Sequence, residues 1–256
     1  APGLISVSYS GHVTSNKKIQ WFTSIESNVF DKNAAGEYEY SVPESYIKYS
    51  AKADMSDASV IKVSGENVER ELPTIDLGII YFNLSHRYKL YNKYTVELTD
   101  LTPGTTYYYS VGSDKYGWTK PAMFATAKAS GGFAFTAITD VQGSVEKNYI
   151  DSYDNLKKAV GSGTDFILSC GDNVDNGKSI MQYTWWLDGQ SDVWTNNTLV
   201  TLAGNHEKKN YSLSSVIATP DEAIINETGY YYSYDYQNVH FVILDTNDLG
   251  ADNALS

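Results

Sequence analysis

The second half of the chain alternates apolar runs with segments of helical period, and this alternation restricts the fold more than any other feature. The apolar runs are Phe133–Ile138, Phe166–Leu168 and Thr198–Ala203, and the helical segments are Asn148–Val160 and Ser179–Trp194. A strand–helix–strand–helix–strand order predicts neighbouring parallel strands joined by helical crossovers. We therefore expect an α/β domain here, with a hairpin over residues 229–245 joining the same layers.

The first half of the chain, up to about residue 126, has almost no helical period. It contains short alternating runs separated by turn residues: Leu4–Tyr9, Ile19–Thr23, Tyr46–Tyr49, Val60–Val63, Lys93–Leu98, Thr106–Val111 and Ala122–Thr126. About seven strands at this spacing predict an antiparallel β-sandwich. Residues 127–132, Ala-Lys-Ala-Ser-Gly-Gly, have the composition of a linker. We expect two domains, over residues 1–128 and 130–256.

Charge and composition limit the partners of the protein. The net charge of −12 argues against nucleic acid or an anionic membrane as a partner. An anionic substrate would therefore need local positive charge from metal ions or from a few basic side chains. The lone Cys170 excludes an internal disulfide. No apolar run approaches the roughly 20 residues of a membrane span.

The chain opens with Ala1-Pro2-Gly3, without an initiator methionine, which is consistent with removal of a signal peptide or with a fusion scar. Glycosylation sequons occur at Asn83, Asn196, Asn210 and Asn226. We expect a secreted or cell-surface protein.

Polar residues follow each of the three apolar runs of the α/β domain. They are Asp140 and Gln142, then Asp172 and Asp175, then Asn205 and His206. Parallel neighbours bring the carboxyl ends of their strands to one edge of a sheet, where open α/β sheets bind their ligands. Carboxylates, amides and an imidazole suit Mg²⁺ or transition metals, and one Asp can bridge two ions about 3.5–4 Å apart. The sequence therefore predicts a metal site at this edge.

The ordered motifs Asp-Val-Gln, Gly-Asp-x-x-Asp and Gly-Asn-His-Glu resemble those of the calcineurin-like metallophosphoesterases. The segment Leu101-Thr-Pro-Gly-Thr-Thr-Tyr107 resembles fibronectin type III domains. With Ile19–Thr23 and Gly117-Trp118 it is similar, more narrowly, to the N-terminal domain of purple acid phosphatases. The resemblance implies a fibronectin III-like sandwich followed by an αββα metallophosphoesterase domain. It also implies metal-dependent hydrolysis of phosphate monoesters or diesters, with two ions of Fe, Zn, Mn or Mg and a metal-bound hydroxide as the nucleophile.

The resemblance also implies a role for each motif residue. Asp140 would ligate the first metal, Asp172 would bridge both, and Asn205 would ligate the second. His206 would stay off the metals and contact the phosphate, stabilising charge or protonating the leaving group. Asp175 would hydrogen-bond His206 and fix its tautomer.

The chain departs from the family pattern at three points. Purple acid phosphatases carry a Tyr at the position of Asp175, so the chain is not expected to be a purple iron enzyme. The wider family has a His at position 142, where Gln142 either offers a neutral amide oxygen to the first metal or faces solvent. The family also supplies further histidines downstream, but His240 is the only His after His206, and we expect it to pack at the core or edge of a strand.

From the third departure we expect the sequence to stop within the phosphoesterase domain. Together with Gln142, it motivates a rival hypothesis. In the rival, the protein is an extracellular surface module that binds metal or phosphate without turnover.

Overall fold

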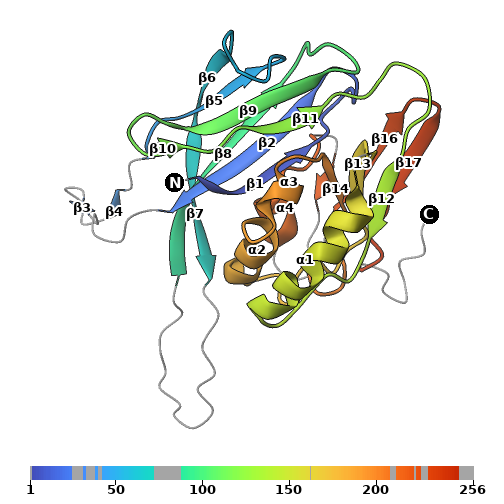
Figure 1. The fold of residues 1–256 in the computed structure, drawn as a ribbon. Helices are drawn as coiled ribbons and strands as arrows, with labels where there is room; N and C mark the ends of the chain where they lie inside the picture. The colour runs from blue at the N-terminus through green and yellow to red at the C-terminus, as the bar shows by residue number, and fades with distance from the viewer. Residues whose placement is uncertain are drawn as a thin grey trace.

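The structure is a computed structural model that describes residues 2–24, 31–32, 38–39, 42–71, 88–161, 163–207, 212–221, 223–225 and 230–247. An all-β part formed by the first half of the chain lies above an α/β part formed by the second half (Figure 1). This order confirms the predicted fold class. None of the described helices is long and apolar enough to cross a membrane.

Two antiparallel sheets form the sandwich. The first has the order β1 (Gly3–Ser8), β2 (Lys17–Ser24), β8 (Tyr88–Leu98), β7 (Gly65–Glu71). The second has the order β10 (Gly117–Trp118), β9 (Thr106–Ser113), β5 (Ser45–Ser50), β6 (Ser59–Val63), and β11 (Ala122–Ala125) also pairs with β9. The short strands β3 (Asp31–Lys32) and β4 (Tyr38–Glu39) pair with each other.

The seven alternating runs all form strands, because each turns one apolar face into the space between the sheets. In that core, Trp21 stacks on Tyr94 with ring centroids 5.5 Å apart. The Pro103-Gly104 turn forms with Gly104 at a φ of +63°, and the Tyr107 hydroxyl accepts the Thr102 N–H at 2.9 Å. Strand β7 was not predicted, because its sequence Gly-Glu-Asn-Val-Glu-Arg-Glu has no apolar alternation and it is placed by its pairing with β8.

The α/β part is built on a parallel sheet of β12 (Phe135–Ile138), β13 (Phe166–Ser169) and β14 (Leu199–Thr201). Its helices are α1 (Glu146–Val160), α2 (Ile180–Leu187), α3 (Ser191–Trp194) and α4 (Ser212–Val216). A second sheet contains β15 (Ile224–Ile225) and the predicted hairpin of β16 (Tyr230–Tyr236) and β17 (Val239–Ile243). Phe166 links the two sheets, with ring centroids 5.1 Å from Tyr236 and 5.6 Å from Phe241.

The predicted single helix over Ser179–Trp194 is wrong, because it is interrupted between α2 and α3. Gly189 lies at the break, and a side chain there would collide with the Trp185 carbonyl oxygen. Asp188 ends α2 and its carboxylate accepts the Leu4 N–H at 2.6 Å. The break therefore lets the end of α2 hold the first strand of the sandwich.

The two parts of the chain share one hydrophobic core. Leu4, Tyr9 and Phe22 of the sandwich belong to the same buried cluster as Phe166 and Trp186. Hydrogen bonds also cross the contact: the Gln20 side chain donates to the Val216 carbonyl at 2.7 Å, the Ala218 N–H to Ser6 Oγ at 2.9 Å, and the Tyr109 hydroxyl to the Thr195 carbonyl at 2.9 Å. Ala127, the first residue of the predicted linker, also packs in this cluster. The linker is thus not separate from the core, and the domain limits at residues 128 and 130 stay predictions.

Lys17 crosses the same contact with a fully buried amine. Its Nζ donates to Thr198 Oγ1 at 2.6 Å and lies 3.8 Å from the centroid of the Tyr9 ring. No carboxylate forms an ion pair with it among the described residues. Burial lowers the pKa of Lys17 well below its usual value, because the charged form loses its hydration.

We predict that Lys17→Met changes how stability depends on pH. In the unfolded chain Lys17 binds a proton below about pH 10.4, whereas in the folded chain burial opposes protonation. The unfolded state therefore binds more protons, and Lys17 lowers the free energy of unfolding as the pH falls. From pH 10 to pH 7, the free energy of unfolding of the variant should rise relative to that of wild type by about 1 kcal/mol or more. This is the free energy that corresponds to a shift of one pKa unit. Urea unfolding at both pH values measures this. Lys52→Met, at an exposed lysine, is the control. Equal slopes of unfolding free energy against pH for wild type and Lys17→Met would contradict the prediction.

Candidate functional site

The three strand ends that carry the predicted residues meet at one edge of the parallel sheet. The Asp140 N–H donates to the Gly171 carbonyl at 3.2 Å, and the Gln142 N–H donates to the Asp172 carbonyl at 3.1 Å. The His206 N–H in turn donates to Asp172 Oδ1 at 3.0 Å. The loop after β13 is thus hydrogen-bonded to both of its neighbours, which parallel pairing of β12, β13 and β14 brings to the same edge.

The backbone is bent sharply where two of these strands end. Asp140 has a φ of +53° and Asp172 a φ of +50°, in the left-handed region that residues other than glycine seldom adopt. Asp tolerates this region better than most side chains, because it can hydrogen-bond locally. Such conformations cost free energy and concentrate at functional sites. Both aspartates predicted to hold metal therefore occupy strained positions.

Two glycines let the loops after β13 and β14 touch. A Cβ on Gly171 would lie 2.7 Å from the Gly204 Cα, and a Cβ on Gly204 would collide with Asp172 Oδ1 and with the Asp172 backbone nitrogen. The backbones approach this closely only because neither residue has a side chain. The contact lets the Asp172 carboxylate reach the loop that carries Asn205 and His206.

Asp175 contacts His206 through its main-chain carbonyl and not through the carboxylate that was predicted to bind it. His206 Nδ1 lies 2.6 Å from the Asp175 carbonyl oxygen and 3.7 Å from Asp175 Oδ1. The Asp175 side chain is exposed, so its carboxylate is hydrated while its carbonyl faces the ring. Because a carbonyl oxygen only accepts, Nδ1 carries the proton and Nε2 is unprotonated in the neutral ring. This hydrogen bond raises the pKa of His206.

Glu207 is a buried acid in this site that the sequence-based assignment did not include. Its carboxylate accepts backbone N–H groups from both the β13 and the β14 loops. Burial raises the pKa of Glu207, an effect that these backbone hydrogen bonds oppose. The available signal was its place at the end of the Gly-Asn-His-Glu motif, although the sequence does not show that it is buried.

The side chains at this edge suit a hard cation. Asp140 and Asn205 are exposed and Asp172 is half-buried. Gln142 is half-buried too, and its Oε1 is shielded from solvent without a hydrogen-bond partner, so the solvent-facing alternative is wrong for this oxygen. An unpaired buried oxygen is costly, and a cation would satisfy it. Two carboxylates and two amides supply the oxygen ligands that Mg²⁺ and Mn²⁺ prefer.

The acidic and imidazole side chains are nevertheless not gathered on one point. Within the described part of the chain, no three His, Cys, Asp or Glu side chains form a group that could hold a metal ion. His240 is exposed on β17, the last strand in the order of its sheet, and its Nδ1 lies 2.6 Å from Asp235 Oδ1. Of the two predicted places for it, the core is wrong and the edge agrees with the structure. The amide oxygens of Gln142 and Asn205 would therefore have to contribute to any ion held here.

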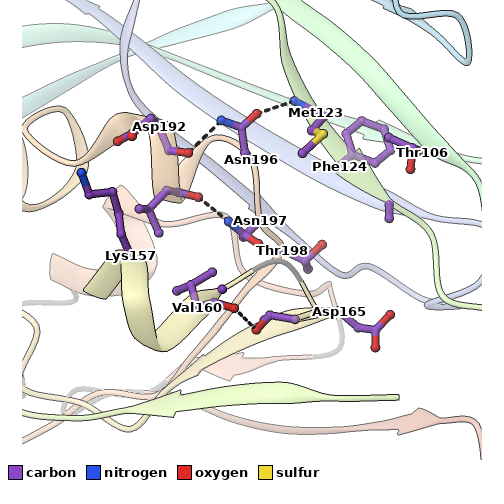
Figure 2. A pocket seen from close by; sticks show the side chains of 14 residues that line it. Thr106, Met123, Phe124, Lys157, Val160, Asp165, Asp192, Asn196, Asn197 and Thr198 are labelled. Atoms are coloured by element: carbon purple, nitrogen blue, oxygen red, sulfur yellow. Dashed lines mark hydrogen bonds between the residues drawn. The ribbon is translucent and has the colours of Figure 1, made fainter. Parts of the chain in front are cut away.

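A cavity of about 500 Å³ lies elsewhere, at the contact between the two parts of the chain (Figure 2). Met123 and Phe124 of the sandwich line one side, and Lys157, Asp165 and Asp192 line the other. Asp165 directly precedes β13, whereas Asp172 follows it. The cavity thus opens near the amino end of the strands and contains none of the six predicted site residues.

Comparisons with known families support the fold assignment. Residues 2–126 match the model of the purple acid phosphatase N-terminal domain, and residues 133–252 match the model of the calcineurin-like phosphoesterases. Members of these families generally use dinuclear metal centres. No curated protein sequence matches the chain significantly.

Solved structures support the fold. The purple acid phosphatase PPD1 from seeds of yellow lupin (Lupinus luteus) is similar with a TM-score of 0.60 and 13% identity, over 94% of this chain and 44% of that enzyme. The chain therefore corresponds to less than half the length of that enzyme. A fibronectin type III domain of human contactin 1 matches with a TM-score of 0.28 and 19% identity, over 52% of this chain and 82% of that domain, a score too low to add to the fold assignment.

We predict that Gly204→Ala damages the site, because its methyl group would overlap the Asp172 carboxylate and backbone. Overpacking of this kind costs about 1–3 kcal/mol, and the displaced Asp172 should weaken Mn²⁺ binding. Gly132→Ala is the matched control, since a Cβ there meets no atom within 4 Å. Thermal unfolding and Mn²⁺ titration calorimetry measure the two effects. A Gly204→Ala protein as stable as Gly132→Ala, with wild-type Mn²⁺ affinity, would show that this contact is dispensable.

Proposed function

This chain belongs to the calcineurin-like phosphoesterases and carries a purple acid phosphatase N-terminal domain, and from that membership we propose that it hydrolyses phosphate esters at the strand-end site. One observation supports the proposal most directly. The three strand ends are hydrogen-bonded neighbours: one carries the buried Gln142 oxygen that has no partner, and another carries the His206 imidazole, whose Nδ1 is bound to the Asp175 carbonyl. The proposed substrate is a small phosphate monoester or diester.

In this proposal Asp140, Gln142, Asp172 and Asn205 would hold two metal ions, and Asp172 would be the central residue of the set, since its loop is hydrogen-bonded to both neighbouring loops. The ions would supply positive charge to the phosphate oxygens and acidify a water molecule. Both tasks matter in a chain with a net charge of −12, whose own field repels an anionic substrate.

His206 has a separate task in the proposal. Its Nδ1–H is bound to the Asp175 carbonyl, so Nε2 is the ring nitrogen that faces the reaction. In the imidazolium form, in which Nε2 also carries a proton, it can stabilise the phosphate or transfer that proton to the leaving group, which leaves the ring neutral. Asp175 acts as a positioning residue through its main chain, since a fixed Nδ1–H holds the ring in one orientation.

A non-catalytic module that binds metal or phosphate is the second candidate. It is favoured by the neutral Gln142 ligand and by the absence, among the described residues, of three acidic, Cys or His ligands around one point. A weakly charged ligand set would hold ions less tightly and activate water less strongly.

We also propose that the protein is secreted or displayed at the cell surface, as purple acid phosphatases often are. The sequon at Asn196 adds little to this, because its amide is occupied: Oδ1 accepts the Met123 N–H at 2.9 Å and Nδ2 donates to the Asp192 carbonyl at 2.8 Å. The sequons at Asn83, Asn210 and Asn226 lie outside the described residues.

The test compares His206→Ala with His240→Ala. Hydrolysis of p-nitrophenyl phosphate and bis(p-nitrophenyl) phosphate is measured with Mn²⁺, Zn²⁺ or Fe²⁺, and Mn²⁺ binding is measured by calorimetry. His206→Ala should lower kcat about 10²–10⁴-fold, the usual value of a positioned acid–base group, while leaving Mn²⁺ affinity unchanged. His240→Ala removes an exposed imidazole on β17 and should change neither quantity.

The outcomes separate the two candidate functions. Turnover that depends on His206 supports the esterase. Mn²⁺ or phosphate binding without turnover above the His206→Ala background supports the binding module. Absence of both Mn²⁺ and phosphate binding in wild type contradicts both.

A further inference from the structure

Both carboxylate oxygens of Glu207 accept hydrogen bonds from backbone N–H groups of the site. Its Oε1 accepts the N–H groups of Asn173 and Val174 at 2.6 and 3.2 Å. Its Oε2 accepts the N–H groups of Asp172 and Gly204 at 3.0 and 2.9 Å. The residue is 2% exposed. A single carboxylate thus collects four backbone donors from the ends of two strands.

Three of these donors belong to consecutive residues, 172–174, where the chain turns away from β13. Successive N–H groups in a turn form a concave site that attracts anions, because their dipoles point to one place. The fourth donor, from Gly204, closes the site from the side of β14. Glu207 occupies this position as an internal anion, with charge-assisted hydrogen bonds that are stronger than neutral ones.

The link made by Glu207 has a counterpart in the opposite direction. Glu207 accepts the Asp172 N–H, while Asp172 Oδ1 accepts the N–H of His206, the residue before Glu207. Each loop therefore donates a backbone N–H to a carboxylate of the other. The loop after β12 does not take part, because two main-chain hydrogen bonds attach it to the β13 loop.

From this geometry we propose that Glu207 is a positioning residue that sets the distance and orientation of Asp172 relative to Asn205 and His206. The inference rests on the proposed function, in which Asp172 and Asn205 hold metal. Glu207 touches neither substrate nor metal in this scheme. Its carboxylate occupies four backbone N–H groups that would otherwise attract the anionic substrate away from the metal ligands. It also holds the loop that carries Asp172 against the loop that carries Asn205 and His206.

The main test is Glu207→Gln. The amide keeps one acceptor oxygen but turns its NH₂ group toward two backbone N–H groups, so one of the two pairs of hydrogen bonds is lost. Glu207→Asp keeps the charge but is one methylene shorter, so it reaches one loop at most. Gln190→Ala is the control, since Gln190 is similarly buried in the same domain and its own hydrogen bonds, with the Tyr149 carbonyl and the Trp194 indole, include no residue of 170–175 or 203–207.

Two measurements are made on each folded variant: Mn²⁺ affinity by calorimetry, and amide hydrogen exchange in residues 170–175 and 203–207. Glu207→Gln should weaken Mn²⁺ binding about 10–100-fold, as loss of a ligand-orienting residue typically does, and should speed exchange in both segments. Gln190→Ala should lower the melting temperature without either change. Glu207→Asp should lie between wild type and Glu207→Gln, and it replaces Glu207→Gln if that variant does not fold.

Two results would overturn the inference. One is a folded Glu207→Gln protein with Mn²⁺ affinity within about twofold of wild type. The other is an equal loss of affinity in Gln190→Ala, which would reduce Glu207 to a general stabilising residue. If wild type binds no Mn²⁺, the proposed function fails, and hydrogen exchange alone decides: faster exchange confined to both segments in Glu207→Gln supports the positioning role, and unchanged exchange refutes it.

Discussion

Parallel pairing of β12, β13 and β14 is the constraint on which the site depends. Only parallel neighbours place three successive strand ends at one edge, and the residues there are bonded loop to loop through Asp140, Gln142 and Asp172. Gly171 and Gly204 then allow two of those loops to touch. The chemistry of the edge follows from this topology, because residues 30–35 positions apart in sequence become hydrogen-bonded neighbours.

The sandwich supports the strands that end at that edge. Lys17 of β2 reaches Thr198, the residue before β14, and the Ile167 N–H of β13 donates to the Thr198 carbonyl at 2.8 Å. The end of α2 is tied to β1 through Asp188. Because these contacts lie in one shared core, a disturbance of the sandwich reaches the strands that carry the site. This gives the N-terminal domain a structural effect on the site without direct contact with a ligand.

Sequence patterns predicted the strands and helices whose buried residues recur at a regular spacing. They failed for features that are set by contacts with residues distant in sequence. The alternating runs predicted the sandwich strands, and three apolar runs predicted the parallel sheet. Strand β7 has no apolar alternation, and the contact of Asp188 with Leu4 at the end of α2 joins residues 184 positions apart, so neither was visible in the sequence. In the site, the motifs identified residue types and order. They could not show that Asp175 meets His206 through its carbonyl, or that Glu207 is buried against four amides.

Electrostatics explains why both candidate functions require a cation. The strand-end edge carries Asp140, Asp172 and Asp175, and only Glu207 has its charge balanced by a set of backbone amides. A phosphate ester 4 Å from one such carboxylate is repelled by about 4 kcal/mol at an effective dielectric constant of 20. A bound cation reverses the sign of that interaction. Metal at this edge would therefore control whether a phosphate binds at all, before any question of turnover arises.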